Sequence, residues 1–251
     1  MTSVEVLSLL QEHAIRGMRV SRTCIEVGGF VAAFHDTEEM VYMNPAFPVQ
    51  TDGGRDVESL LAAYAERGRK PWLEFAVELW PEVVAELEAS GLQCVHRMPV
   101  MVLARSEWEP RDSAAREPRA DEVREFMEAG LASFGVTESV KESQVERTRK
   151  SFDSGRVLAS LVEKDERIVS VGQAVGTAEV REVAGLGTLE AYRRQGYCTA
   201  VIQDLLARHF GGGGEVAWLT PGDEGARRVY EKSGFRPVGT QVTYALEPFR
   251  G

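Results

Sequence analysis

Apolar and polar residues follow first a helical and then a strand spacing between residues 120 and 175. A stripe with steps of mainly three and four residues predicts an amphipathic helix, and its members are Val123, Phe126, Met127, Leu131 and Phe134. A second, shorter helix is expected over 139–151. The segments 157–162 and 168–175 are rich in β-branched residues and flank the charged turn 163–167, so they predict an antiparallel hairpin.

Helices and strands continue to alternate up to residue 246. A third strand is expected over 180–189, and a helix that begins near Gly196 should stop at the glycines 211–214. A short apolar strand is expected over 216–219 and a helix begins near Asp223. A last strand over 242–246 is expected to close the same sheet. This order predicts a mixed α/β fold.

The first half of the chain repeats part of this plan. Glu88-Ala-Ser-Gly-Leu92 matches Glu231-Lys-Ser-Gly-Phe235, and each is expected to end a helix and begin a strand. Gly53 precedes the first copy of this sequence by the same distance as Gly196 precedes the second. We therefore expect a degenerate copy of the second half in the first.

A polar segment bracketed by prolines separates the two halves. Residues 106–118 have neither helical nor strand spacing over most of their length, and are interpreted as a linker. The sequence thus predicts a first domain over 1–105 and a second over 119–251.

Composition narrows the function classes. The net charge of −10 repels phosphate backbones, so nucleic acid is not an expected partner, whereas an amine is compatible with it. Cys24, Cys94 and Cys198 are too few and too scattered for a disulfide framework or a four-cysteine zinc site. No apolar run is long enough to span a bilayer and no secretion signal is visible, so a cytoplasmic location is expected.

The segment Arg193-Arg-Gln-Gly-Tyr-Cys198 joins a predicted strand to a predicted helix and has the features of a pyrophosphate site. The first turn of a helix offers unpaired N–H groups and the positive end of its dipole. Gly196 removes the Cβ that would block a close approach, and the two arginines add positive charge. In the first half, Asp52 and Asp56 stand where an anion would have to lie, so that half is not expected to bind one.

These residues resemble the GNAT superfamily of N-acetyltransferases, whose signature is Arg/Gln-x-x-Gly-x-Gly/Ala after the fourth strand. Here it reads Arg193-x-x-Gly196-x-Cys198, and a second family segment appears as Asp223-Glu-Gly-Ala-Arg-Arg-Val-Tyr-Glu-Lys-Ser-Gly-Phe235. The resemblance covers roughly 120–246, and the first half is similar to the degenerate domain of tandem members. Two residues depart from the family pattern. Cys198 replaces Gly or Ala, and Asp223 replaces Asn, which keeps helix capping but adds a negative charge.

The resemblance implies two GNAT-like domains in tandem, the second binding acetyl-CoA as co-substrate, with no metal. It implies a set of cofactor-binding residues at the third strand, the glycine turn and the last helix: Leu186, Gly187, Thr188, Arg193, Arg194, Gln195, Gly196, Tyr197, Cys198, Thr199, Asp223 and Ala226. Backbone N–H groups around Thr188 would bind the pantetheine arm and polarise the acetyl carbonyl.

Acetyl transfer to an amine requires a base for the amine and benefits from an acid for the departing thiolate. By resemblance Tyr230 is the candidate general acid, with aromatic packing as the alternative, and Glu182 on the third strand is the candidate base, with a solvated strand glutamate as the alternative. Glu190 and Glu179 are weaker candidates for the base.

Other functions stay open at this point. Cys198 as a nucleophile is disfavoured because the nearest histidine in sequence, His209, lies eleven residues further along the same helix. The leading expectation is an N-acetyltransferase acting on a primary amine of a small molecule or peptide. The alternatives are a non-catalytic acyl-CoA-binding or scaffold protein with this fold, and a structural subunit of a homodimer.

Overall fold

The computed structural model describes residues 2–50 and 54–246, which form two compact units that interleave along the chain. Unit 1 comprises Met1–Met101, Thr220–Gly222 and Pro237–Gly251, and unit 2 comprises Val102–Leu219 and Asp223–Arg236. The predicted division into domains 1–105 and 119–251 thus stays a prediction, and the two compact units have different boundaries. Gly53 and Asp52 lie outside the described residues.

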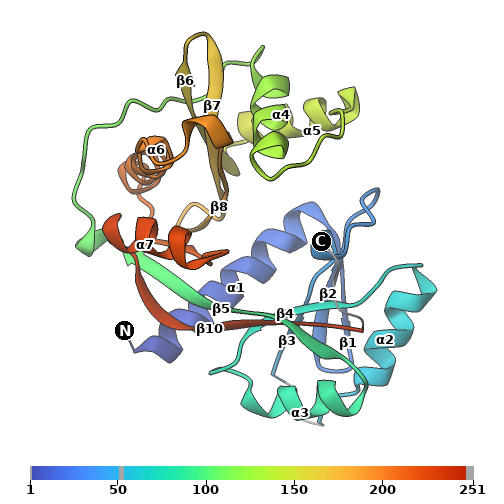
Figure 1. Cartoon of the computed structure of the whole chain (residues 1–251). Helices are drawn as coiled ribbons and strands as arrows, with labels where there is room; N and C mark the ends of the chain where they lie inside the picture. Colours follow the sequence, from blue (N-terminus) through green and yellow to red (C-terminus); the bar gives the residue numbers. More distant parts are fainter. Residues whose placement is uncertain (1, 51–53, 247–251) are drawn as a thin grey trace. The chain divides into compact units, whose positions relative to one another are not determined.

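Unit 1 is a mixed sheet with three helices (Figure 1). Its strands are ordered β1-β2-β3-β4-β10-β5, and β3 and β4 run parallel while β4 and β10 run antiparallel. The elements are α1 (Ser3–Ser21), β1 (Thr23–Val27), β2 (Phe30–Phe34), η1 (Val41–Met43), β3 (Ala46–Pro48), α2 (Val57–Glu66), β4 (Trp72–Ala76), α3 (Pro81–Ala89), most of β5 (Gln93–Ala104) and nearly all of β10 (Arg236–Ala245).

Local chemistry explains where the helices of unit 1 begin. Thr2 and Glu5 form a capping box before α1, because the Thr2 hydroxyl accepts from the Glu5 N–H and the Glu5 carboxylate accepts from the Thr2 N–H. Asp56 caps α2 by accepting from the Ser59 N–H at 3.0 Å. Pro81 stands at the first position of α3, where its missing N–H costs nothing.

Unit 2 is a sheet of order β9-β8-β7-β6 with helices on both faces. Its elements are η2 (Arg105–Glu107), α4 (Val123–Ser133), α5 (Glu142–Asp153), β6 (Val157–Lys164), β7 (Arg167–Gly176), β8 (Val180–Thr188), η3 (Glu190–Tyr192), α6 (Tyr197–Gly211), β9 (Val216–Leu219) and α7 (Glu224–Lys232). The helices and strands predicted between 120 and 235, and the hairpin of β6 and β7, are confirmed within a few residues.

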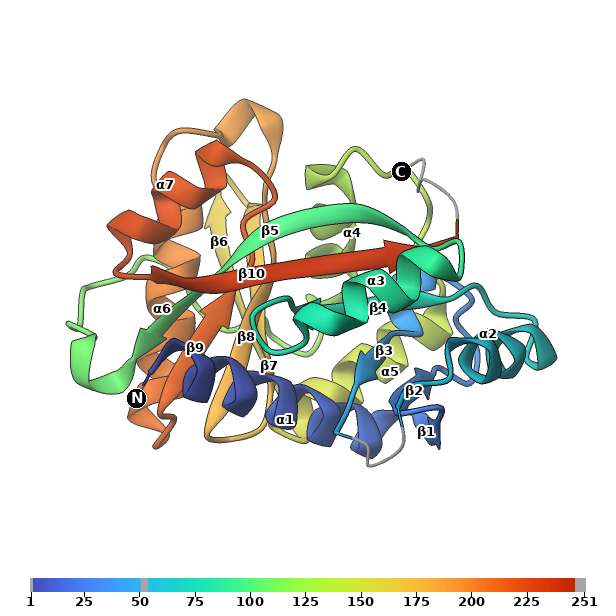
Figure 2. The same cartoon turned by 90° about the horizontal axis from the view of Figure 1, so that it is seen from below.

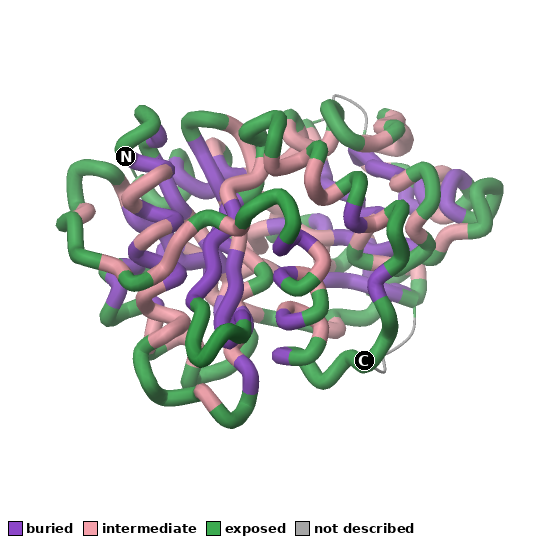
Figure 3. The backbone as a smooth tube through the Cα atoms, turned by 90° about the horizontal axis from the view of Figure 1, so that it is seen from above, coloured by how far each residue is buried: buried purple, intermediate pink, exposed green. Residues whose placement is uncertain are grey.

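Helices α4 and α6 cover opposite faces of the sheet of unit 2. Val171 and Gly172 are neighbours on β7, and successive strand residues point to opposite faces. Val171 contacts Gly130 of α4, whereas a Cβ on Gly172 would overlap Val201 of α6. Figure 1 shows the two helices on either side of these strands. In Figure 3 many buried residues form straight stretches of the backbone, and the bends that connect these stretches are mostly exposed.

The last strand of each half departs from the predicted arrangement. Residues 242–246 were expected to close the sheet of the second half, but β10 pairs with β4 of unit 1, with Val242 opposite Phe75. Figure 2 shows β10 running beside β5. The end of β5 belongs to unit 2, where the Arg105 N–H donates to the Glu215 carbonyl at 2.9 Å. The last strand of the second half, β10, thus belongs to unit 1, and the end of the last strand of the first half, β5, belongs to unit 2.

Helix positions agree with the predicted internal repeat. Helix α7 begins and ends 143 residues after α3, and β10 begins 143 residues after β5. The same spacing separates Gly91 from Gly234, and both have a positive φ, of 84° and 99°. The helix-to-strand corner is therefore the best preserved part of the repeat.

The segment interpreted as a linker, 106–118, packs on unit 2 and is not a free connection. Arg116 exchanges two backbone hydrogen bonds with Leu161 of β6, at 2.9 and 2.8 Å. The Ser113 hydroxyl donates to the Ala200 carbonyl of α6 at 2.7 Å, and the Trp108 ring lies 5.2 Å from that of Phe210. The sequence did not predict these contacts, because most of them are made by backbone and hydroxyl groups and leave no apolar pattern.

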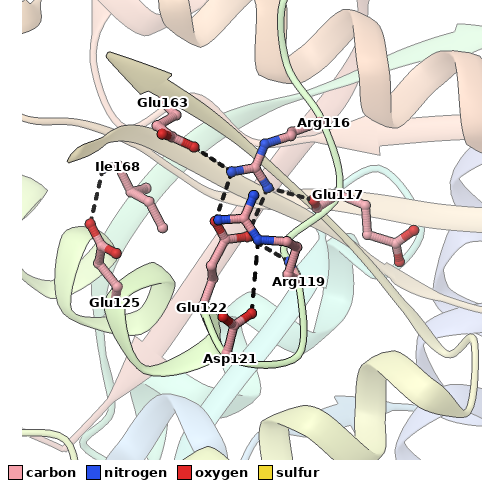
Figure 4. A network of polar contacts seen from close by, with 8 residues as sticks. All are labelled: Arg116, Glu117, Arg119, Asp121, Glu122, Glu125, Glu163 and Ile168. Atoms are coloured by element: carbon pink, nitrogen blue, oxygen red, sulfur yellow. Dashed lines mark hydrogen bonds and ion pairs between the residues drawn. The ribbon is translucent and has the colours of Figure 1, made fainter. Parts of the chain in front are cut away.

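A charged network fixes the end of this segment to α4 and β6 (Figure 4). Arg116 donates to both oxygens of Glu122 at 2.7 Å and to Glu163 at 2.5 Å. Glu122 is 7% exposed and also accepts from the Arg119 N–H at 2.6 Å. Mainly through the hydrogen bond from Arg116, the pKa of Glu122 is lowered to about 2 from an ordinary 4.5.

We expect Glu122→Gln to destabilise unit 2 at neutral pH by an amount that disappears in acid. A carboxyl group with a lowered pKa stabilises the fold above its unfolded pKa, and this stabilisation is lost as the pH falls from about 4.5 towards 2. At pH 7 the loss should be on the order of 2 to 3 kcal/mol. Denaturant unfolding of both proteins at pH 7 and pH 3 measures it, with exposed Glu128→Gln as the control. An equal gap at both pH values would contradict the role of this carboxylate.

Candidate functional site

The first turn of α6 presents its backbone N–H groups to solvent. Gly196 is the N-cap residue with φ 85°, and Arg194 has φ 61°, so the chain makes a left-handed turn before the helix. The first helical hydrogen bond joins the Ala200 N–H to the Gly196 carbonyl, which leaves the N–H groups of 197–199 without a helical acceptor. Residues 193–196 are exposed, so an anion can reach these donors.

The two arginines of the motif are placed differently. The Arg193 guanidinium donates to the Thr188 carbonyl at 3.1 Å and to the Ser133 carbonyl at 2.9 Å. It therefore ties the glycine turn to β8 and to the end of α4. The Arg194 side chain is exposed and makes no ion pair or hydrogen bond with another described residue. Of the two side chains, Arg194 is the one available to a phosphate.

Strand β8 changes its partners along its length. It pairs with β9 from Val180 to Glu182 only, and with β7 up to Thr188. A bulge at Gly185, which has φ 60°, shifts the register with β7. The Leu189 N–H donates to the Val169 carbonyl of β7 at 2.9 Å. Because N–H groups alternate in direction, that of Thr188 points away from β7, to the side where β9 no longer pairs.

Two close approaches hold the end of β8 between helices. A Cβ on Gly187 would overlap the Ser133 hydroxyl of α4, and one on Gly172 would overlap Leu186 and Val201. The buried Ser170 hydroxyl donates to the Gly187 carbonyl at 3.0 Å and lies 2.9 Å from that of Thr188. The motifs did not reveal Ser133 and Ser170, because serine at a strand or helix position carries no distinctive spacing.

Tyr230 lies in α7 with its side chain largely buried. Its ring packs edge-on against Phe235, and burial raises the pKa of its hydroxyl above the usual range, with further contributions from charge at Cys198 and Asp223. Tyr230 therefore lies within electrostatic range of Cys198 and Asp223. The hydroxyl makes no hydrogen bond with the described residues, yet it is not fully enclosed. The Tyr230 hydroxyl is therefore protonated and can donate a hydrogen bond to a bound molecule.

Cys198 is not suited to act as a nucleophile. It sits in the first turn of α6, where the helix dipole favours a thiolate, but burial raises the pKa of its thiol to about 11. The thiol therefore stays protonated at neutral pH. His209 is buried, and its Nε2 lies 3.0 Å from the Val216 carbonyl, so it is committed to β9.

The carboxylates predicted around the site fall in different places. Glu182 is the last residue of β8 that pairs with β9, opposite Trp218, and its side chain is half-buried. Asp223 caps α7, accepting from the Ala226 N–H at 2.7 Å, as its capping ability predicted. Glu190 is exposed in η3, and the Glu179 carbonyl accepts from the N–H groups of 215 and 216.

The turn brings most of the predicted cofactor residues to one end of the sheet of unit 2. Strand β8 supplies 186–188, the turn 193–196 and the start of α6 197–199. Gln195 donates to the Ala191 carbonyl at 3.4 Å within the same turn. The roles of these residues stay predictions. No three His, Cys, Asp or Glu residues within 2–50 and 54–246 are grouped to hold a metal ion. In the same ranges, every helix is too short or too polar to cross a membrane.

Comparison with known proteins finds a family model that matches the segment containing this site. The model of the acetyltransferase (GNAT) family matches residues 123–235. No curated protein matches the chain. Among solved structures, the chain is similar to a GCN5-related N-acetyltransferase from Kribbella flavida, with 24% identity, a TM-score of 0.75 and coverage of 96% of this chain and 95% of that one.

Two further structures extend the likeness in fold over most of the chain. A GCN5-related N-acetyltransferase from Sphaerobacter thermophilus has 16% identity and a TM-score of 0.67, with 98% of this chain and 93% of that one covered. A tandem GNAT protein from the clavulanic acid biosynthesis pathway has 12% identity and a TM-score of 0.57, with 90% and 80% covered. The part of the chain that matches the acetyltransferase (GNAT) family, 123–235, therefore lies almost entirely in unit 2 and includes the turn that precedes α6.

Proposed function

We propose that this protein transfers an acetyl group from acetyl-CoA to a primary amine of a small molecule or peptide. The observation that carries the proposal is the exposed N-terminus of α6, with its free backbone N–H groups, directly after the end of β8. These donors and the Arg194 guanidinium would bind the pyrophosphate of the coenzyme. The family of the domain supports an acyl-CoA as the donor.

Strand β8 would hold the acyl end of the same molecule. The Thr188 N–H points to the side where β9 has ended, so it can donate to the pantetheine arm or to the acetyl carbonyl. An extended chain bound along this edge would add hydrogen bonds in the manner of another strand. Residues 186–188 would therefore fix where the thioester lies, and proximity would supply much of the rate.

The chemical step requires two proton transfers. The amine nitrogen attacks the thioester carbonyl carbon, a C–N bond forms and the C–S bond breaks. The amine proton passes to a base, for which Glu182 is the candidate, directly or through water, and the departing thiolate takes the proton of the Tyr230 hydroxyl. The open hydrogen-bonding position of Tyr230 and its place beside the first turn of α6 support this assignment.

Release of free thiol from acetyl-CoA in the presence of a panel of primary amines tests the proposal. Amine-dependent release, with the acetylated amine identified by mass spectrometry, is the expected result. Calorimetry with CoA provides the second measurement. Binding without any thiol release would overturn the transferase and favour a non-catalytic acyl-CoA-binding protein, and no binding at all would overturn both.

Tyr230→Phe is expected to lower kcat by about 100-fold, the usual size of a general acid contribution, while CoA affinity changes less than twofold. The fold should persist, because the hydroxyl has no hydrogen-bond partner to lose among residues 2–50 and 54–246. Since the pKa of Tyr230 is raised, the wild type should show no loss of kcat from this group below pH 10. Full turnover in the variant would remove the acid role and leave the packing role of the ring.

A further inference from the structure

Phe134 is an exposed aromatic residue beside the proposed reaction site. It follows α4 directly and its side chain is 65% exposed, the largest exposed fraction among the large apolar residues within 2–50 and 54–246. Its Cε2 lies 3.6 Å from the position of a Cβ on Gly187, the residue before Thr188. The exposed ring offers an apolar surface to a molecule bound at the end of β8.

The backbone that presents this ring is fixed. Gly135 has φ 76°, and the N–H groups of Gly135 and Val136 donate to the carbonyls of Ala132 and Leu131, which is a Schellman motif. Arg193 adds a hydrogen bond to the carbonyl of Ser133 at 2.9 Å. The ring is therefore held at the end of β8 and its exposure does not come from a loose loop.

The ring also lies on the face from which an acceptor has to arrive. Gly187 faces Ser133 of α4, whereas the N-terminus of α6, the proposed pyrophosphate site, belongs to the opposite face of the sheet. A coenzyme bound at the N-terminus of α6 would cover the side of its thioester that faces α6. The amine would then approach the carbonyl from the side of α4, where Phe134 lies.

We propose that Phe134 selects acceptor amines that carry an apolar or aromatic group close to the nitrogen, an inference that rests on the proposed transferase function. The reacting amine is neutral, so a cation–π contact with its ammonium form would be lost before the transition state. An apolar contact between the ring and the substituent persists through it and raises kcat/KM. The ring thus discriminates by the substituent and not by the charge.

The test compares two amines, phenethylamine and ethanolamine, with acetyl-CoA held at saturation. Phe134→Ala should lower kcat/KM for phenethylamine by about 10-fold and change that for ethanolamine less than twofold. Phe134→Tyr keeps the ring and should retain the preference for phenethylamine. Val20→Ala, at a residue of α1 that is 64% exposed, is the matched control and should change neither value. Calorimetry with CoA should give the same affinity for all four proteins.

The outcomes separate this inference from the proposed function. If the wild type acetylates both amines and Phe134→Ala leaves their ratio unchanged, the specificity role is overturned while the transferase stands. If the wild type prefers ethanolamine, the apolar class is overturned as well. If the wild type binds CoA and acetylates neither these nor any other amine of the panel, the transferase itself fails and the inference fails with it.

Discussion

A chain that ends at Phe235 is expected to lose the folded structure of unit 1, although the deleted residues lie more than 130 positions after the end of its first segment. The deletion removes β10, whose Val242 and Tyr244 are 0% and 3% exposed in the core of unit 1. It also leaves β4 without its antiparallel partner over 72–76. Burial lost at two large core residues alone costs on the order of 5 kcal/mol, comparable to the whole stability of a domain.

Far-UV circular dichroism and limited proteolysis measure this loss. We expect the truncated chain to be cleaved rapidly within 2–101 under conditions in which the full chain is resistant. For the same reason, fragments 1–105 and 119–251 should not fold when produced separately, because each lacks the strand or strand end supplied by the other half.

A pair of point variants distinguishes loss of the core from loss of chain length. Val242→Asp places a charge in the core of unit 1 and should lower the free energy of unfolding by about 4 kcal/mol. Leu246→Asp, four residues later and 46% exposed, should change it by less than 0.5 kcal/mol. If fragment 1–105 is protected from proteolysis like the full chain, the pairing of β10 with β4 is not needed for unit 1.

Local patterns were sufficient to predict the elements of the second half but not the partner of their last strand. The spacing of Val123 and Phe126, the charged turn after β6 and the glycines after α6 act within one element or one turn. The pairing of β10 depends instead on which strands, far apart in the sequence, tertiary packing brings beside it. The expectation that consecutive strands lie side by side holds for most connections and fails for β9 and β10, which belong to one sheet but have β5 between them.

The same limit applies to the candidate site. The helix starts near Gly196 and Asp223 were predicted correctly, because glycine turns and capping chemistry depend on neighbouring residues. Arg193 was predicted to bind the coenzyme, and what the sequence did not reveal is that its guanidinium bonds to the carbonyls of Thr188 and Ser133. The direction of a long side chain depends on acceptors brought near by tertiary packing, and 60 positions separate Ser133 from Arg193 in the chain.

Gly196→Asp is expected to weaken CoA binding by at least about 100-fold while the fold persists. A Cβ at Gly196 would meet no atom within 4 Å, so the new side chain has room in front of the first turn of α6. The strain of φ 85° costs on the order of 1 kcal/mol, and aspartate tolerates this conformation better than most residues. The carboxylate would then occupy the place proposed for the pyrophosphate and repel it.

Unit 1 contains a natural example of this arrangement. At the start of α2, Asp56 accepts from the Ser59 N–H at 3.0 Å and from the Ser59 hydroxyl at 2.5 Å, and these hydrogen bonds lower the pKa of its carboxyl. A carboxylate at a helix start thus satisfies with its own oxygens the donors that an external anion would use.

Calorimetry with CoA, combined with thermal unfolding, separates these effects. Gly196→Ala introduces the backbone strain alone and should weaken binding less than 10-fold, whereas Gly196→Asn adds the same volume as aspartate without the charge and should give an intermediate affinity. If aspartate and alanine weaken binding equally, backbone strain explains the loss and the carboxylate does not compete with the coenzyme. If Gly196→Asp binds CoA as the wild type does, the pyrophosphate does not lie at the start of α6, because no diphosphate would tolerate a carboxylate among its backbone donors.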